Sequence, residues 1–585
     1  MKRNITITTS VLLLGTAIAC KDTFLEKKPY GAVTFETLSQ SQTGADAILI
    51  SAYSLLDGFS SWDNGNPWGS AASNWVYGSI KGGDAYKGSE ANDQPDITPF
   101  ERHEETPLNP YVEAKWNTYY DGIARANQAI NAYDAIAGLP AETKNLRVAE
   151  GRFLRAFYHY ELKRVFNMVP YIDDKTTEFR VPNDKDIWPN IQADLQFAVQ
   201  NLPTRQSEPG RATKGAAQAL LGITYMWQKN YQAAKAQFDA VIASGVYKLS
   251  PTYHENFNAD FRNTSESILE VQQAVNIGTD DQGNIGDVLN YTHSAGPGGC
   301  CGFHQPSQNL VNAFKTDANG LPLIADYNKE GDDVKNDQGI TSDQPFTPDT
   351  RTLDPRLDWT VGRRGIPYFD WGKHPGASWI RLQAYGGPFS PKKNSYYKRQ
   401  EGTLTSASGW TKGYNANNVK LIRYADVLLM AAEAEVELNN LTKAREYVNL
   451  VRARAANPAG FVKQYKDDAK PELGDSDKPA ANYLIKEYPA AHPAFATQAA
   501  AREAVRFERR LELGMEGHRF FDLVRWGVAE RVLNDYLNVE SKKRSYLANA
   551  RFTPNKSEYR PIPRRAIDRS AKDGAATIKQ NPGYQ

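Results

Sequence analysis

Most of the residues that could do chemistry in this chain are aromatic side chains outside helical periodicity. Seven of the eleven tryptophans lie in loop-like segments, and they recur among Gly, Asn and Asp in residues 60–86 and 358–385. Rings that fill a core are expected mainly within periodic helices, so this placement favours a surface role for some of them. Aromatic rings stack on the apolar faces of sugars, while carboxylate and guanidinium groups bind hydroxyls.

We therefore predict that these two segments meet and form one oligosaccharide-binding face. The predicted ring platforms are Trp68, Trp75, Trp371 and Trp379. The predicted hydroxyl partners are Asp84, Arg363 and Arg381, which flank those rings. The alternative is that the rings form a minor core beneath long loops, and the sequence leaves it open for each of them.

Catalytic motifs are missing from the sequence. There is no phosphate-binding glycine loop, HExxH, nucleophile elbow or paired-cysteine metal motif. With 68 acidic residues, a pair of carboxylates at a glycosidase-like separation arises by chance. The pairs Asp280–Asp281 and Asp332–Asp333 lack the spacing of an EF-hand calcium site, which favours solvated loop charges. We predict a protein that is not an enzyme and needs no cofactor or metal.

Two of the three cysteines are neighbours in a glycine-rich run, residues 296–302. In an oxidising exterior, Cys300 and Cys301 can form a vicinal disulfide that makes a rigid turn. The alternative is a pair of free, partly buried thiols.

The N-terminus reads as an export signal. Lys2 and Arg3 precede an uncharged run, residues 5–19, that is too short to span a bilayer. Small residues directly before Cys20 resemble a bacterial lipobox, although Ala17 stands where a larger aliphatic residue is usual. We predict a signal peptide over 1–19 and lipidation of Cys20, with ordinary cleavage as the alternative. Several acyl chains would anchor the protein to a membrane.

The elements that must position these residues are helical. Residues 214–244 read as two helices with a period near 3.6, joined by a turn at 228–230 and preceded by Thr213 as a cap. Gly222, Tyr225, Ala234 and Phe238 fall at the intervals of a tetratricopeptide (TPR) pair. An ordinary antiparallel hairpin is the alternative. One pair cannot bury its own faces, so companion pairs are expected.

Composition and pattern divide the chain into blocks. A net charge of +1 and a pI near 7.6 argue against a nucleic-acid surface. We predict a mainly α scaffold of TPR-like pairs in residues 20–256 and 416–585, with an aromatic loop at 57–96. Residues 257–415 form a large irregular subdomain that carries the ligand-binding region.

Three motifs near the C-terminus resemble those of the SusD/RagB family. They are FERRLEL at 507–513, EGHRFFD at 516–522 and RWG at 525–527. YRPIP at 559–563 with QNPG at 580–583 is similar to the family's ending, and EGRFLRA at 150–156 to its first long helix. The likeness runs from Cys20 to the end of the chain. Within the motifs, Glu508, Arg510 and His518 are interpreted as holding helices together.

The resemblance implies a lipoprotein on the outer face of the outer membrane, with four TPR-like pairs and an irregular ligand face. Such proteins are not enzymes. They cap a SusC-like TonB-dependent transporter and hand it oligosaccharides, or peptides in the RagB branch. The loop tryptophans favour an oligosaccharide ligand. Peptide capture and a TPR adaptor that binds only protein remain alternatives.

Overall fold

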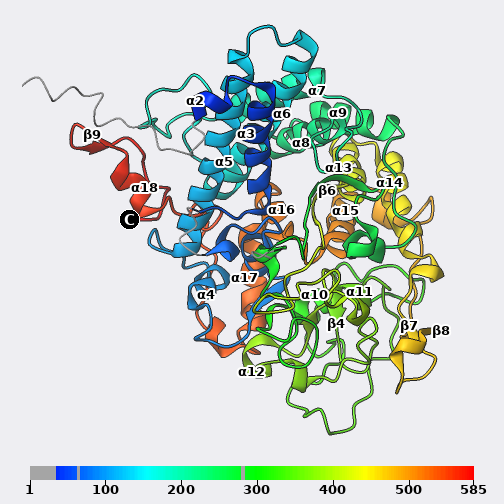
Figure 1. Cartoon of the computed structure of the whole chain (residues 1–585). Coiled ribbons are helices and arrows are strands. Elements are labelled where there is room, and N and C mark those ends of the chain that lie inside the picture. The colour runs from blue at the N-terminus through cyan, green and yellow to red at the C-terminus, as the bar shows by residue number, and fades with distance from the viewer. Residues whose placement is uncertain (1–34, 62–65, 279–282) are drawn as a thin grey trace, which may run out of the picture.

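The computed structural model describes residues 35–585 apart from 62–65 and 279–282. In Figure 1 most of the long helices gather in one half of the molecule, and the irregular chain of the middle block, with several short helices, fills the other half. Cys20 and the Asp280–Asp281 pair lie outside the described residues. None of the helices in the described residues is both long enough and apolar enough to cross a membrane.

The helical half is a series of neighbours in sequence that pack side by side. α3 packs on α5, α5 on α6, α6 on α7, α7 on α8 and α8 on α9, while α13 joins α9, α14 and α15. The helices are α2 (Phe35–Leu38), α3 (Gln42–Ser54), α4 (Thr98–Arg102), α5 (Pro110–Ala135), α6 (Ala141–Phe166), α7 (Trp188–Asn201), α8 (Lys214–Trp227), α9 (Tyr231–Ala243), α10 (Gln308–Ala313), α11 (Leu357–Thr360), α12 (Gln383–Gly386), α13 (Tyr424–Glu437), α14 (Leu441–Ala455), α15 (Gln498–Leu513), α16 (Arg519–Arg525), α17 (Ala529–Glu540) and α18 (Arg564–Arg569). This arrangement confirms the mainly α prediction.

The α8–α9 hairpin forms where the periodicity predicts it. Thr213 caps α8 by accepting a hydrogen bond from the Ala216 backbone N–H at 3.2 Å. Phe238 is fully buried, and a Cβ on Gly222 would lie 2.5 Å from its ring. A side chain at Gly222 would therefore push the two helices apart.

The strands are short and tie distant segments together. The antiparallel pairs are β1 (Ala85–Gly88) with β3 (Phe303–Pro306), β2 (Ser267–Val271) with β6 (Val419–Arg423), β4 (Val361–Gly362) with β5 (Ser390–Pro391), β7 (Lys463–Tyr465) with β8 (Asp475–Pro479), and β9 (Ala571–Lys572) with β10 (Ala575–Ala576). The β2–β6 pair joins the two ends of the irregular block next to the helices. The β1–β3 pair joins that block to the early aromatic loop. The domain boundaries themselves stay predictions.

The C-terminal signature segment is two helices rather than one. α15 ends at Leu513 and α16 begins at Arg519, and Met515 and Gly517 between them have positive φ values of 68° and 76°. A Cβ on Gly517 would lie 2.0 Å from the Ser73 carbonyl oxygen. Glycine is therefore required there both by the backbone conformation and by the close approach of the aromatic loop.

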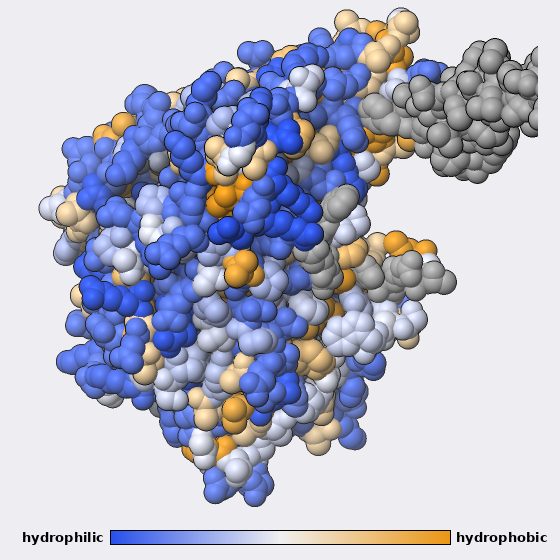
Figure 2. All heavy atoms as spheres, turned by 90° about the vertical axis from the view of Figure 1, so that its left-hand side faces the viewer, coloured by the Kyte–Doolittle hydropathy of each residue, from blue (hydrophilic) through white to orange (hydrophobic). Residues whose placement is uncertain are grey.

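Hydrophilic residues cover most of the face shown in Figure 2, and hydrophobic ones form small separate patches. Exposed large hydrophobic side chains are accordingly scattered along the chain, and Trp410 and Phe179 are among them. A single exposed apolar residue needs no functional explanation. A candidate site must therefore show more than exposure.

Candidate functional site

A glycine-rich loop at residues 291–302, here called the disulfide loop, is held rigidly from two sides. Within it, Cys300 and Cys301 form a vicinal disulfide, and the Thr292 hydroxyl donates to the Pro297 carbonyl at 3.0 Å. From outside, the Tyr396 hydroxyl accepts a hydrogen bond from the Gly298 N–H at 2.6 Å. The Thr411 hydroxyl donates to the Gly298 carbonyl at 2.7 Å.

Aromatic rings surround this loop. Tyr396 lies between Tyr291 and Trp371, with ring centroids 5.6 Å and 6.0 Å away. Trp371 is half-buried, and its indole N–H donates to the Tyr396 carbonyl at 3.0 Å. Trp379 also contacts the loop, where its carbonyl accepts a hydrogen bond from the His293 N–H at 2.9 Å. Tyr396 therefore bonds both the loop and Trp371, and Trp379 bonds the loop directly.

Trp410 is an exposed ring beside this loop, directly before the Thr411 that donates to Gly298. Its side chain is 61% exposed, yet its indole N–H donates to the Tyr414 hydroxyl at 2.8 Å. The two rings meet edge to face with centroids 6.0 Å apart. An indole that is open to solvent and held in one orientation is pre-organised to stack on a flat apolar ligand surface.

Arg381 supplies charge at the same loop. Its guanidinium donates to the Ser89 hydroxyl and to the Glu90 carboxylate, each at 3.0 Å, and also pairs with Asp93. About a third of its side chain is exposed. Burial and the positive charge of Arg381 lower the pKa of the neighbouring His293. The group places hydrogen-bond donors and acceptors at the disulfide loop, beside His293 and Gly302.

The structure brings together three of the predicted site residues, Trp371, Trp379 and Arg381, with the predicted cysteine pair. Trp379 is only 8% exposed and packs edge to face on Tyr368 at 5.5 Å. It therefore supports the loop from below more than it offers a platform.

Trp75 is not on this face, and the prediction that it forms a platform is wrong. Its ring is fully buried, it donates to the Gly286 carbonyl at 3.0 Å, and it contacts Phe303. Trp68 is half-buried against the main core. The two segments do meet, because α12 packs on β1, but Trp75 lies in the core and not on a shared surface.

Asp84 and Arg363 also prove to be structural, which corrects their prediction as hydroxyl partners. Asp84 is 2% exposed and pairs with Arg510 at 3.0 Å. Arg363 is 2% exposed and pairs with Asp358. A charge this deep with its partner in place has no surface to offer a ligand.

The sequence reading missed Trp410 and His293 as site residues. Trp410 belongs to the seven loop tryptophans, but it lies outside the two segments chosen from them. Its flanks, Ser408–Gly409 and Lys412–Gly413, contain only glycine and polar residues. These flanking residues are typical of a surface turn, and they could have indicated that Trp410 is exposed.

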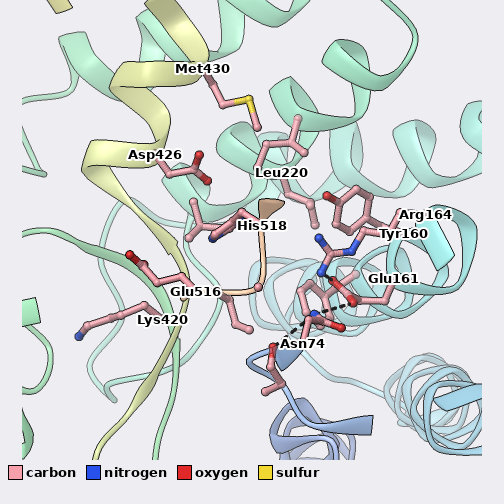
Figure 3. A pocket seen from close by; sticks show the side chains of 16 residues that line it. Asn74, Tyr160, Glu161, Arg164, Leu220, Lys420, Asp426, Met430, Glu516 and His518 are labelled. Atoms are coloured by element: carbon pink, nitrogen blue, oxygen red, sulfur yellow. Dashed lines mark hydrogen bonds and ion pairs between the residues drawn. The ribbon is translucent and has the colours of Figure 1, made fainter. Parts of the chain in front are cut away.

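The interpretation of the signature residues as structural agrees with their contacts. Glu508 pairs with Arg356 and Arg452 at 2.8 Å and 2.7 Å and is fully buried. Arg510 joins α15 to the aromatic loop through Asp84. Figure 3 shows the third residue, His518, with Glu516 at a cavity of about 50 Å³. Burial lowers the pKa of His518.

Among the described residues, no group of three or more His, Cys, Asp or Glu side chains is arranged to hold a metal ion. Asp332 pairs with Lys315 and Arg351, and Asp333 accepts from Asn312 and pairs with Lys543. Cations of the protein already neutralise this pair of carboxylates.

Comparison with known proteins identifies relatives over nearly the whole chain. The model of the SusD family matches residues 265–584, and a second model, described as starch-binding associating with outer membrane, matches 23–226. SusD-like protein P25 of Formosa agariphila is 25% identical over 553 residues, which is 90% of each chain.

Solved structures share the fold. A SusD superfamily protein from Bacteroides vulgatus aligns with a TM-score of 0.66 at 21% identity, covering 93% of this chain and 100% of that one. Surface glycan-binding protein A from Bacteroides thetaiotaomicron, solved in complex with laminarihexaose, aligns with a TM-score of 0.63 at 20% identity, covering 92% and 99%. The chain belongs to the SusD family.

Proposed function

We propose that this protein is a non-catalytic surface lipoprotein that captures oligosaccharides and delivers them to a SusC-like TonB-dependent outer-membrane transporter. The observation that carries the proposal is Trp410, an exposed ring fixed in one orientation beside a rigid loop. Solved relatives named as a laminarin-binding SusD-like protein and as glycan-binding proteins support an oligosaccharide as the ligand class.

The disulfide loop and its neighbours would bind a sugar in two ways. The indole face of Trp410 covers the apolar C–H face of a sugar ring, and half-buried Trp371 offers a further ring edge. Arg381 and its carboxylate partners Glu90 and Asp93 exchange hydrogen bonds with hydroxyl groups. Because the groups are already ordered, little conformational entropy is lost on binding.

A glycan array tests the ligand class, with the protein lacking residues 1–20 and with laminarihexaose among the probes. Trp410→Ala should abolish binding to the recognised glycan. Phe179→Ala, which removes another exposed ring, 71% exposed and on the helical half, should leave binding unchanged. Both variants should keep the stability of the wild type to within about 0.5 kcal/mol. Binding to peptides alone, or glycan binding that survives Trp410→Ala, would contradict the proposal.

The lipid anchor and the transporter need separate tests. Cys20→Ser should release the protein from the outer-membrane fraction and abolish palmitate labelling. Purification of the lipidated protein from its native membrane should bring a TonB-dependent transporter with it. If the serine variant still labels with palmitate, Cys20 is not the lipidation site.

A further inference from the structure

A separate groove of about 680 Å³ lies between α15, α16, α17 and the segment 324–329. Its walls carry several aromatic residues: Tyr327, Phe507, Trp526 and Tyr536. It also carries four arginines: Arg506, Arg510, Arg519 and Arg531. A concave site of this size is typical of small-ligand binding, and its many charged and polar lining residues suit a polar ligand.

The arginines differ in whether the protein already neutralises them. Arg510 is engaged by Asp84 at 3.0 Å and by the Asn309 side-chain oxygen at 2.7 Å. Arg506 pairs with Glu503 at 3.1 Å. The Arg519 side chain forms no hydrogen bond or ion pair with any residue in the part of the chain that the structure describes. Its Nε is shielded from solvent without an acceptor.

The surroundings of Arg519 leave an excess of positive charge. Burial, and then the nearby charge of Arg510, lower the pKa of Arg519 to about 10. The group is still charged at neutral pH, so a half-buried guanidinium remains without an ion-pair partner among the described residues, and its shielded Nε lacks an acceptor. Leaving a shielded donor without an acceptor is costly. The other carboxylates of the groove, Asp326 and Asp535, are exposed.

We propose that this groove is a second ligand site and that Arg519 binds the oxyanion of an acidic sugar, a carboxylate or a sulfate. A guanidinium matches either group with two parallel hydrogen bonds. Trp526, half-buried in the same wall, provides a ring for the sugar itself. The binding of an oxyanion is independent of the disulfide loop. Only the assignment of the oxyanion to a sugar depends on the proposed function.

The test is calorimetric titration with a galacturonic acid tetramer and with its fully methyl-esterified form, which is the same chain without charge. A sulfated galactan tetramer and its desulfated counterpart distinguish sulfate from carboxylate. Arg519→Gln should weaken binding of the acidic tetramer by at least about tenfold, which is the loss expected when a charged hydrogen-bond donor is removed. The neutral forms should bind the wild type and the variant equally.

Controls separate this site from the first one. Arg565→Gln removes an exposed arginine on α18, 56% exposed, and should leave the affinity for the acidic tetramer unchanged. Trp410→Ala should also leave it unchanged, while abolishing the binding of neutral glycan. Arg519→Lys keeps the charge without the paired geometry and should show intermediate affinity. The lysine variant also serves if the glutamine variant fails to fold.

Three results would overturn the inference. They are equal affinity of the wild type for charged and neutral tetramers, unchanged affinity in both Arg519 variants, and loss of acidic-tetramer binding in Trp410→Ala. The last result would place the acidic sugar at the disulfide loop and leave the first proposal standing. If neutral glycan binds nowhere but the acidic tetramer still depends on Arg519, the first proposal fails and this one holds.

Discussion

Charged side chains usually lie on the surface and aromatic ones in the core. The C-terminal end of α15 and the disulfide loop with the neighbouring Trp410 both depart from this placement. Glu508 and Glu512 are fully buried, and Glu516 is only 6% exposed at its side chain. Trp410, which directly precedes the Thr411 that donates to the disulfide loop, is 61% exposed. One region therefore buries carboxylates, and the other presents an indole to solvent.

The difference lies in whether partners are already in place. Glu512 contacts Arg423 at 2.6 Å and Arg356 at 3.0 Å, so its desolvation is offset by a network that joins α15 to β6 and to the irregular block. Trp410 has its indole N–H bonded but leaves its ring face uncovered. Buried charged groups whose ion-pair partners are in place stabilise the scaffold. An aromatic ring that is held in one orientation but exposes its face to solvent is a candidate for ligand binding.

The largest expected effect comes from breaking the buried network. Glu512→Gln removes one charge and leaves Arg356 and Arg423 short of a partner, so we expect a loss of about 3–5 kcal/mol in the free energy of unfolding. Glu446→Gln removes the same charge from a half-exposed pair with Lys443 and should cost about 0–1 kcal/mol. Urea unfolding of both variants measures the difference. Equal costs would show that the network does not hold the scaffold.

The second prediction concerns the stability of the folded protein at low pH. Arg423 and Lys393 lower the pKa of Glu516 from 4.5 to about 2 against the opposing effect of burial. A depressed carboxyl pKa stabilises the folded protein above the unfolded pKa, and this stability is lost as pH falls from about 4.5 to about 2. The contribution is about 3 kcal/mol.

Buried acids with raised pKa values act in the opposite direction. Glu101, whose pKa burial raises to about 7, is one of them. The measurement therefore compares the wild type with Glu516→Gln in urea at pH 6, 4 and 3. The stability gap between the two proteins should narrow as pH falls. A constant gap would contradict the assignment.

The third prediction compares packing in the two regions. Ala234 is fully buried in the α8–α9 hairpin, and Ala295 is exposed in the disulfide loop. Ala234→Leu should cost about 1–3 kcal/mol by overpacking, whereas Ala295→Leu should stay within about 0.5 kcal/mol. Thermal unfolding distinguishes them. If both substitutions are tolerated, the hairpin is packed more loosely than its contacts indicate.

The same contrast explains what the sequence could predict. Periodicity predicted α8, α9 and their turn, because apolar residues recur at every third or fourth position along the buried face of a helix. The structural role of Glu508 and Arg510 followed from their position inside a periodic segment. Periodicity carries no information about which loop residues meet. Trp75 and Trp410 have similar Gly- and Ser-rich flanks, yet one ring is buried against Phe303 and the other is exposed.

Burial in the loops depends on long-range contacts that no local pattern records. Asp84 is hidden because Arg510, 426 residues later in the sequence, reaches it. Arg363 pairs with Asp358 in the interior, and the Tyr483 hydroxyl, 125 residues after Asp358, donates to the same carboxylate. Choosing these two residues because they lie near tryptophans in sequence could not anticipate either pairing.

The smallest expected effect on stability comes from removing the vicinal disulfide. The same change should have a larger effect on glycan binding. A bond between adjacent cysteines closes a minimal loop, so replacing both residues by serine should cost only about 1 kcal/mol. The disulfide loop would still lose a constraint beside Trp410, and glycan affinity should fall while the melting temperature barely changes. Intact-mass analysis should first show the oxidised protein two hydrogens lighter than its reduced form. Ready alkylation of Cys300 and Cys301 without reductant would mean that free thiols are present. Unchanged glycan affinity in Cys300→Ser/Cys301→Ser would mean that hydrogen bonds from Tyr396 and Thr411 are enough to hold the loop.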